Sequence, residues 1–142
     1  MVDSEIHDIY LALSKMKVGK VKCRNIDKIK LAIRDRDLPC RFLLPSTEGD
    51  LNFVALGSSP MSIQWVIRDL LLWAPITKGA GIEKFAKAML DYEMLYIRRI
   101  QETMNPTLQS VVTSVSWRQS PIPWADRDYW GIDYTLNIAE IV

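Results

Sequence analysis

The chain has 142 residues, of which 49% are hydrophobic and 25% are charged, so it fits a single folded domain over residues 1–142 rather than a disordered segment. Its 18 basic and 17 acidic residues give a net charge of +1, without the basic surface that duplex DNA binding usually needs. Two cysteines, no signal-like start and no apolar run near the ~20 residues of a membrane span predict a protein made in a reducing cytoplasm, with no membrane contact.

The first predicted element is an amphipathic helix over residues 4–17, where apolar residues recur every three or four positions. Asp3 or Ser4 can cap its start, and Gly19 lies just past its end, where a left-handed residue would terminate it. The apolar stripe consists of Ile6, Ile9, Tyr10, Leu13 and Met16.

Short strands are predicted next, over residues 20–26 and between Pro39 and Pro45, where each proline marks an interruption of ladder pairing. The segment between them fits either a strand or a helical turn. The stretch "STEGD" predicts a turn, and "LNFVAL" predicts the next strand.

Alternation of apolar and polar residues predicts a strand over residues 61–73. Its end, "LLLWAP", is apolar on both faces, as in a strand buried on both sides. After a break with Gly79 and Gly81 as hinges, a long helix is predicted from Ile82 to Thr103, ending before Pro106. Its stripe is Ile82, Phe85, Met89, Tyr92, Tyr96 and Ile100, and Lys84, Lys87, Glu93 and Arg99 lie largely off it.

The last third predicts a strand in "SVVTSVSWRQ", a loop in "SPIPWADRD" and a final strand over residues 130–142. Two helices cannot cover both faces of such a sheet, and antiparallel sheets commonly bury one face. We therefore expect an α+β fold, with an antiparallel sheet of four to six strands and two main helices packed on one face.

The chain offers few residues for catalysis. His7 is the single histidine and lies off the first helix's apolar stripe, and the glycines of "TKGAG" match no phosphate-binding pattern. The carboxylates of "RDRD" and "DRD" alternate with arginines, as in solvated surface clusters. We expect no enzymatic activity, no cofactor and no metal site.

The two long strands, of thirteen residues each, would each reach ~43 Å if unbroken, whereas a domain of this size has a radius of gyration near ~14–15 Å. Such strands must bend over the core or project and pair with another chain. Their polar faces carry mainly Ser, Thr, Asn and Gln, without the charges that usually deter association. Assembly is the explanation we favour.

Three stretches together resemble the tail terminator (tail completion) proteins of long-tailed bacteriophages. They are "RDLPCRFLLP", "MSIQWVIRDLLLWAPITKGAGIEKFAKAMLDYEMLYIRRI" and "YWGIDYTLNIAEIV". The resemblance implies a small α+β protomer that closes into a six-membered ring at the head-proximal end of the tail tube. Such rings end tube polymerisation and present a surface to the head-side connector, while DNA passes through the lumen without being read.

The resemblance also implies site residues in the virion, where the ring would act after synthesis in the host cytoplasm. The polar face of the last two strands would line the channel or meet the adjacent subunit, through Ser114, Ser116, Arg118, Asp133, Thr135 and Asn137. Two predicted loops would contact the tail tube protein or the connector, through Glu48, Asp50, Trp124, Asp126 and Arg127.

Two alternatives stay open. The chain would also fit another component of the head–tail neck. Trp124, held between prolines and charged residues, would either fold back under the sheet or anchor a partner in a small protein-binding module.

Overall fold

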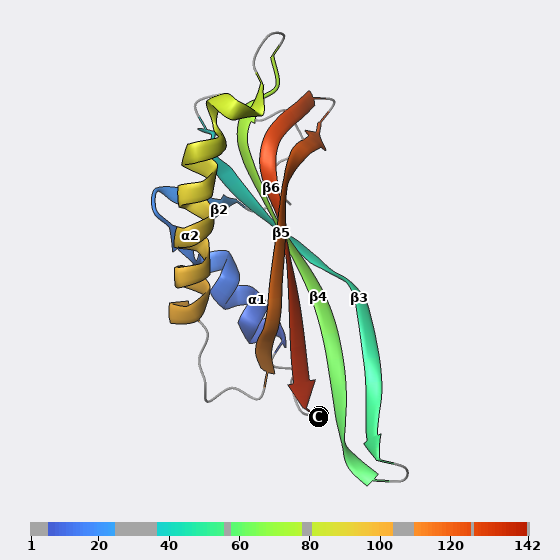
Figure 1. Cartoon of the computed structure of the whole chain (residues 1–142). Coiled ribbons are helices and arrows are strands. Elements are labelled where there is room, and N and C mark those ends of the chain that lie inside the picture. Colours follow the sequence, from blue (N-terminus) through green and yellow to red (C-terminus); the bar gives the residue numbers. More distant parts are fainter. Residues whose placement is uncertain are drawn as a thin grey trace.

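The computed structural model describes residues 6–24, 37–55, 58–77, 81–103, 110–125 and 127–141. They form one six-stranded sheet and two main helices, which confirms the expected α+β class (Figure 1). In chain order the elements are α1 (Ile6–Lys15), β1 (Lys17–Val18), β2 (Val21–Arg24), β3 (Cys40–Ala55), β4 (Ser58–Pro75), the 3-10 helix η3 (Ile82–Lys84), α2 (Ala86–Thr103), β5 (Ser110–Trp124) and β6 (Arg127–Ile141).

The sheet has the strand order β1-β2-β3-β4-β6-β5, and β3, β4, β6 and β5 are antiparallel throughout. β2 departs from this pattern, because it pairs with β3 in the parallel sense, with Cys23 opposite Arg41. β1 and β2 form a small hairpin whose turn holds Gly19 at φ 60°. The left-handed glycine was correctly predicted, but it closes this hairpin rather than capping α1.

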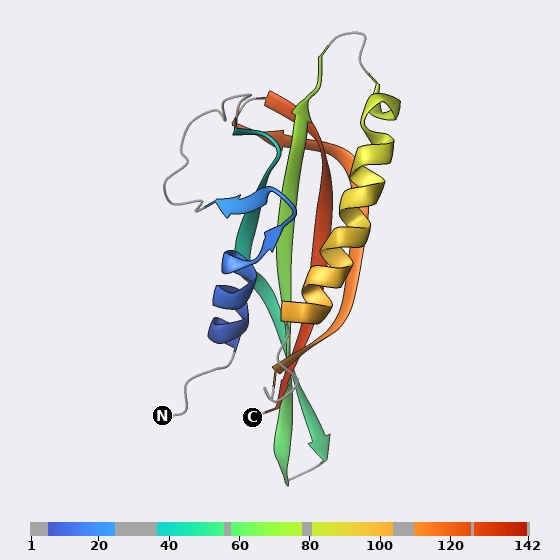
Figure 2. The ribbon, with the colours of Figure 1, turned by 90° about the vertical axis from the view of Figure 1, so that its left-hand side faces the viewer.

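Both helices lie on the same face of the sheet, seen edge-on in Figure 1 and from the helix side in Figure 2. The predicted stripes of α1 and α2 supply much of the main core, which confirms both helical periodicities. We call this side the helix-covered face and the opposite side the open face. The buried residues of the main core are Ile9, Leu13, Met16, Val18, Val21, Leu43, Ile67, Leu71, Met89, Tyr92, Tyr96, Ile100, Ile132, Tyr134, Leu136 and Ile138.

The predicted turn over residues 46–50 is wrong, because β3 runs through it as one strand of 16 residues. Pro45 does interrupt the ladder: Leu44 faces Arg68, and the next pair is Glu48 with Val66. The intervening residues form an irregularity in the ladder, and the proline, which has no N–H, therefore does not have to donate a ladder hydrogen bond there. Backbone pairing with β4 therefore overrides the local turn preference of "STEGD".

The predicted loop over residues 120–128 is also mostly strand. β5 continues through Pro121 and Pro123 to Trp124, and β6 starts at Arg127. β5 lies at the edge of the sheet, where a proline costs no interior ladder bond. The turn includes Ala125, whose φ is 49°.

A second, smaller cluster of buried residues lies on the open face, at the end of the sheet near the β5–β6 turn. Leu70 and Leu72 belong to it, whereas Leu71 belongs to the main core, so β4 is buried on both faces as predicted. The Trp124 ring stacks on Phe42 of β3, with centroids 4.3 Å apart. Because β4 and β6 separate β5 from β3 in the sheet, this stack requires the sheet to curl at that end.

A buried ion pair, Arg41 with Asp69, lies within the main core. Arg41 donates from Nε to Asp69 at 3.0 Å and from Nη1 to the Met16 carbonyl at 2.8 Å. Tyr96 donates to the same carboxylate at 2.7 Å, and burial raises the pKa of its hydroxyl well above the usual value, so it stays a donor. This group ties α1, α2, β3 and β4 together.

Glu93 was placed off the α2 stripe, and this is wrong: it is buried and accepts a hydrogen bond from Gln119 Nε2 of β5 at 2.7 Å. The expected caps Asp3 and Ser4, the hinge Gly79 and the helix stop Pro106 lie outside the described residues.

Candidate assembly interface

The six candidate residues of the last two strands lie together on the open face. In the β5–β6 register they form three directly opposed pairs: Ser114 with Asn137, Ser116 with Thr135, and Arg118 with Asp133. Antiparallel partners project to the same side of a sheet, and this is the side opposite Tyr134 and Leu136 of the main core. The alternation of the strands was therefore enough to group these residues.

Hydrogen bonds hold part of this polar face in place. Asn137 Nδ2 donates to Ser114 Oγ at 2.8 Å, and Thr113 Oγ1 donates to the Asn137 carbonyl at 3.1 Å. A β-bulge between Val112 and Ser114 sets the register, since the ladder passes from Val112–Ile138 directly to Ser114–Asn137.

Sequence reasoning missed Arg68 of β4 as a member of this face. Its Nε donates to Asp133 Oδ1 at 3.3 Å and the two side chains form an ion pair. The alternation of β4 had placed Arg68 on a polar face, but only the strand order puts β4 beside β6.

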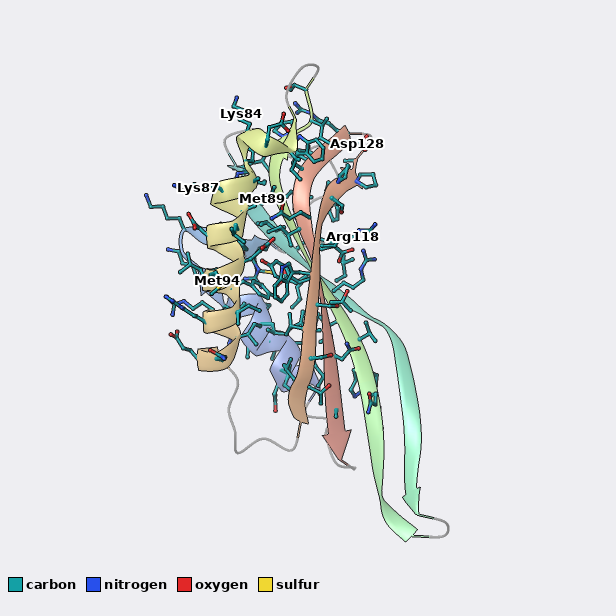
Figure 3. The ribbon with its side chains drawn as sticks, in the orientation of Figure 1. Lys84, Lys87, Met89, Met94, Arg118 and Asp128 are labelled. Carbon is teal, nitrogen blue, oxygen red and sulfur yellow. The ribbon has the colours of Figure 1, made fainter. Side chains whose placement is uncertain are left out.

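Arg118 faces Asp133 across the ladder, yet that carboxylate pairs with Arg68 instead. Figure 3 shows Arg118 projecting from β5 on the side away from α2. The exposed guanidinium of Arg118 has no ion-pair partner within the described ranges. The open face is thus polar and slightly positive around β5 and β6.

Four of the five predicted contact residues are described by the structure, and they lie toward opposite ends of the sheet. Glu48 and Asp50 are strand residues of β3, where they face Val66 and Gln64, and not loop residues as predicted. Trp124 and Arg127 face each other at the β5–β6 turn, near the Pro75 end of β4. At ~3.3 Å per residue the two groups are roughly 36 Å apart along β4.

The Trp124 side chain is half-buried against Phe42 and the second cluster, so its ring packs within the protomer. Arg127 is exposed, with its guanidinium carbon 5.8 Å from the centre of the Tyr129 ring. Asp126 lies outside the described residues.

The sheet ends in two long edges. β2 covers β3 at Arg41 and Phe42, and the Tyr10 hydroxyl donates to the Leu43 carbonyl at 3.0 Å. Past this point β3 has no strand on its outer side among the described elements, and neither does β5. We call residues 48–55 and 58–66 of the β3–β4 hairpin the hairpin arm, because Figures 1 and 2 show its tip projecting beyond the end of β6.

An exposed apolar strip runs beside the β5 edge. Leu90 and Met94 of α2 are 55% and 56% exposed, and Trp117 of β5 is 44% exposed. The Gln119–Glu93 hydrogen bond joins the two elements: Glu93 adjoins Met94, and Trp117 lies two residues before Gln119 on the same side of β5. We call Leu90, Met94 and Trp117 the apolar strip.

Within the ranges that the structure covers, no group of three or more His, Cys, Asp or Glu side chains is placed to hold a metal ion. No helix of the described portion has the length and hydropathy to cross a membrane. A scan against models of protein families gives no match, and a search of curated proteins finds no significant similarity.

Proposed function

We propose that this chain is a structural virion protein that forms a ring, hexameric by resemblance, at the head-proximal end of a phage tail tube. The ring ends tube polymerisation and joins the tail to the head connector. The observation that carries the proposal is the extended hairpin of β3 and β4, with 16 and 18 residues. It reaches past the rest of the described sheet and has a long edge that no other described strand covers (Figure 1).

The sheet topology supports a ring of identical copies. An open edge presents unpaired N–H and C=O groups that another strand can satisfy. β3 and β5 bound an even number of antiparallel strands, so they run in opposite directions within one protomer. Copies in the same orientation can therefore join β3 to β5 in the antiparallel sense, and such head-to-tail contacts generate rings when the rotation closes.

The open face suits a passive lumen. Its Ser, Thr and Asn side chains are polar and uncharged and its charges are few, so DNA would pass without base recognition.

The predicted contact residues fall into two groups at opposite ends of the sheet, which agrees with one partner protein at each end of the ring. Residues 48–50 belong to the hairpin arm, and Trp124 and Arg127 lie at the other end of the sheet. One end would face the major tail tube protein and the other the head-side connector.

The test is assembly with purified tail tube protein, followed by mass photometry and electron microscopy. We expect closed rings at micromolar concentration, tube ends capped by them, and tubes that stop growing. A strictly monomeric chain that leaves tube length unchanged would reject the proposal. Binding to connector rings without any binding to tubes would identify another neck component instead.

A further inference from the structure

We propose that the β5 edge and the apolar strip of one protomer receive the hairpin arm of a second copy. This inference rests on the proposed ring and specifies the surface through which the ring closes. The partner is a second copy, because the arm and its receiving surface match in strand direction, in polarity and in charge.

The first match between the arm and its receiving surface is in strand direction. Among the described elements, no strand covers the outer edge of β3 past Leu43 or the outer edge of β5 along its 15 residues. These edges run in opposite directions, so the arm of a like-oriented copy extends the sheet at β5 by one more antiparallel strand.

The second match is between the residue types on the two faces of the arm and those on the receiving surface. By register, positions 48 and 50 face Val66 and Gln64 on the open face, whereas positions 51 and 53 face Ile63 and Met61 on the helix-covered face. The first two positions hold Glu and Asp, and the second two hold Leu and Phe. Figure 1 shows that neither α1 nor α2 reaches the tip of the arm.

The receiving surface has the complementary pattern. On the helix-covered side of β5 lies the apolar strip, and on the open side lies Arg118 without an ion-pair partner among the described residues. Arg118 is the one charged residue in the sequence of β5, and the arm's sequence contains two acidic residues and no basic one. Docking therefore places apolar against apolar on one face and opposite charges together on the other.

The experiment uses two complementary variants. One shortens the arm by joining Asn52 to Ser62, which face each other across the hairpin, through an Asn-Gly turn; the hairpin then stops where β6 stops, at Ile141. The other is the double variant Leu90→Asp/Met94→Asp. Leu11→Asp is the matched control, because Leu11 is a 39% exposed apolar residue of α1, a helix that contributes no residue to the strip.

We expect each variant alone to weaken association by at least about tenfold, as loss of a central contact does. The control should form rings like the unmodified chain. An equimolar mixture of the two variants should stop at a heterodimer, because one contributes an intact arm and the other an intact strip. Circular dichroism of each variant establishes that it is folded.

A charge exchange gives a test that does not depend on shortening the hairpin. Arg118→Glu should weaken the ring, and Glu48→Lys/Asp50→Lys in the same chain should restore it. If either the short-arm variant or the double variant formed normal rings, the inference would be overturned, but the proposal that the chain forms a ring would not. A wild-type chain that never associates would overturn both.

Discussion

At the scale of single residues, the most consequential contact is the buried pair of Arg41 and Asp69. Both side chains are almost fully removed from water, and their remaining hydrogen bonds go to Tyr96 and to carbonyls at the end of α1. Removing one member leaves the other charged and unpaired in the core, which costs more than the pair contributes.

We predict that Asp69→Ala lowers the free energy of unfolding by about 3–5 kcal/mol. The double substitution Arg41→Met/Asp69→Leu should recover most of this loss, because no uncompensated charge remains. Urea unfolding followed by circular dichroism measures both. The exposed pair of Arg68 and Asp133 is the control, and Arg68→Ala should cost about 0–1 kcal/mol. Equal losses at the two pairs would contradict this account.

At the scale of elements, the irregularities of the ladders decide where side chains point. Between Leu72 and Ala74 the β4–β6 register shifts, with Gly131 and Trp130 as the successive partners. β4 has one extra residue, Trp73, at this bulge. A Cβ atom at Gly131 would overlap the backbone carbonyl oxygen of Leu71 and come 2.9 Å from Ile122 Cδ1. The glycine therefore allows the close approach of the two strands.

We predict that Gly131→Ala destabilises the protein by about 1–3 kcal/mol or more, because the clash involves backbone that cannot rotate away. The thermal midpoint should fall accordingly in differential scanning calorimetry. Ala125→Gly is the control at another special backbone position, since Ala125 already has a positive φ. There the relief of strain and the added freedom of the unfolded chain oppose each other, and the change should stay below about 1 kcal/mol. An unchanged midpoint for Gly131→Ala would show that β6 can move away from β4.

At the scale of the whole molecule, the sheet is extended at one end and curled at the other. The curled end is held by the stack of Trp124 on Phe42 and by the second cluster. An aromatic side chain that packs inside the protomer contributes to its stability, whereas an aromatic side chain that is exposed and anchors a partner does not.

We predict that Trp124→Ala lowers the free energy of unfolding by about 1–3 kcal/mol through lost burial and stacking. Trp117→Ala, at an exposed position of the same strand, should cost less than about 1 kcal/mol. Chemical denaturation of both variants makes the comparison. If Trp124→Ala left stability unchanged and abolished binding to a partner protein, the binding-module alternative would be favoured.

The sequence alone determined the periodic features. The stripes of α1 and α2, the double-sided burial of β4 and the grouping of Ser116 with Ser114 all follow from spacing along one element. These patterns are local, because a helix or a strand turns its side chains by a constant angle from one residue to the next.

Only the tertiary structure decided which elements are neighbours. It joined "STEGD" and the proline-rich segment into strands, since pairing with β4 and β6 compensates for weak local preference. It placed Arg68 beside Asp133, Glu93 beside Gln119 and Trp124 on Phe42, which are far apart in the chain. Such contacts depend on strand order and on the curl of the sheet, and the spacing of residues along one strand contains neither.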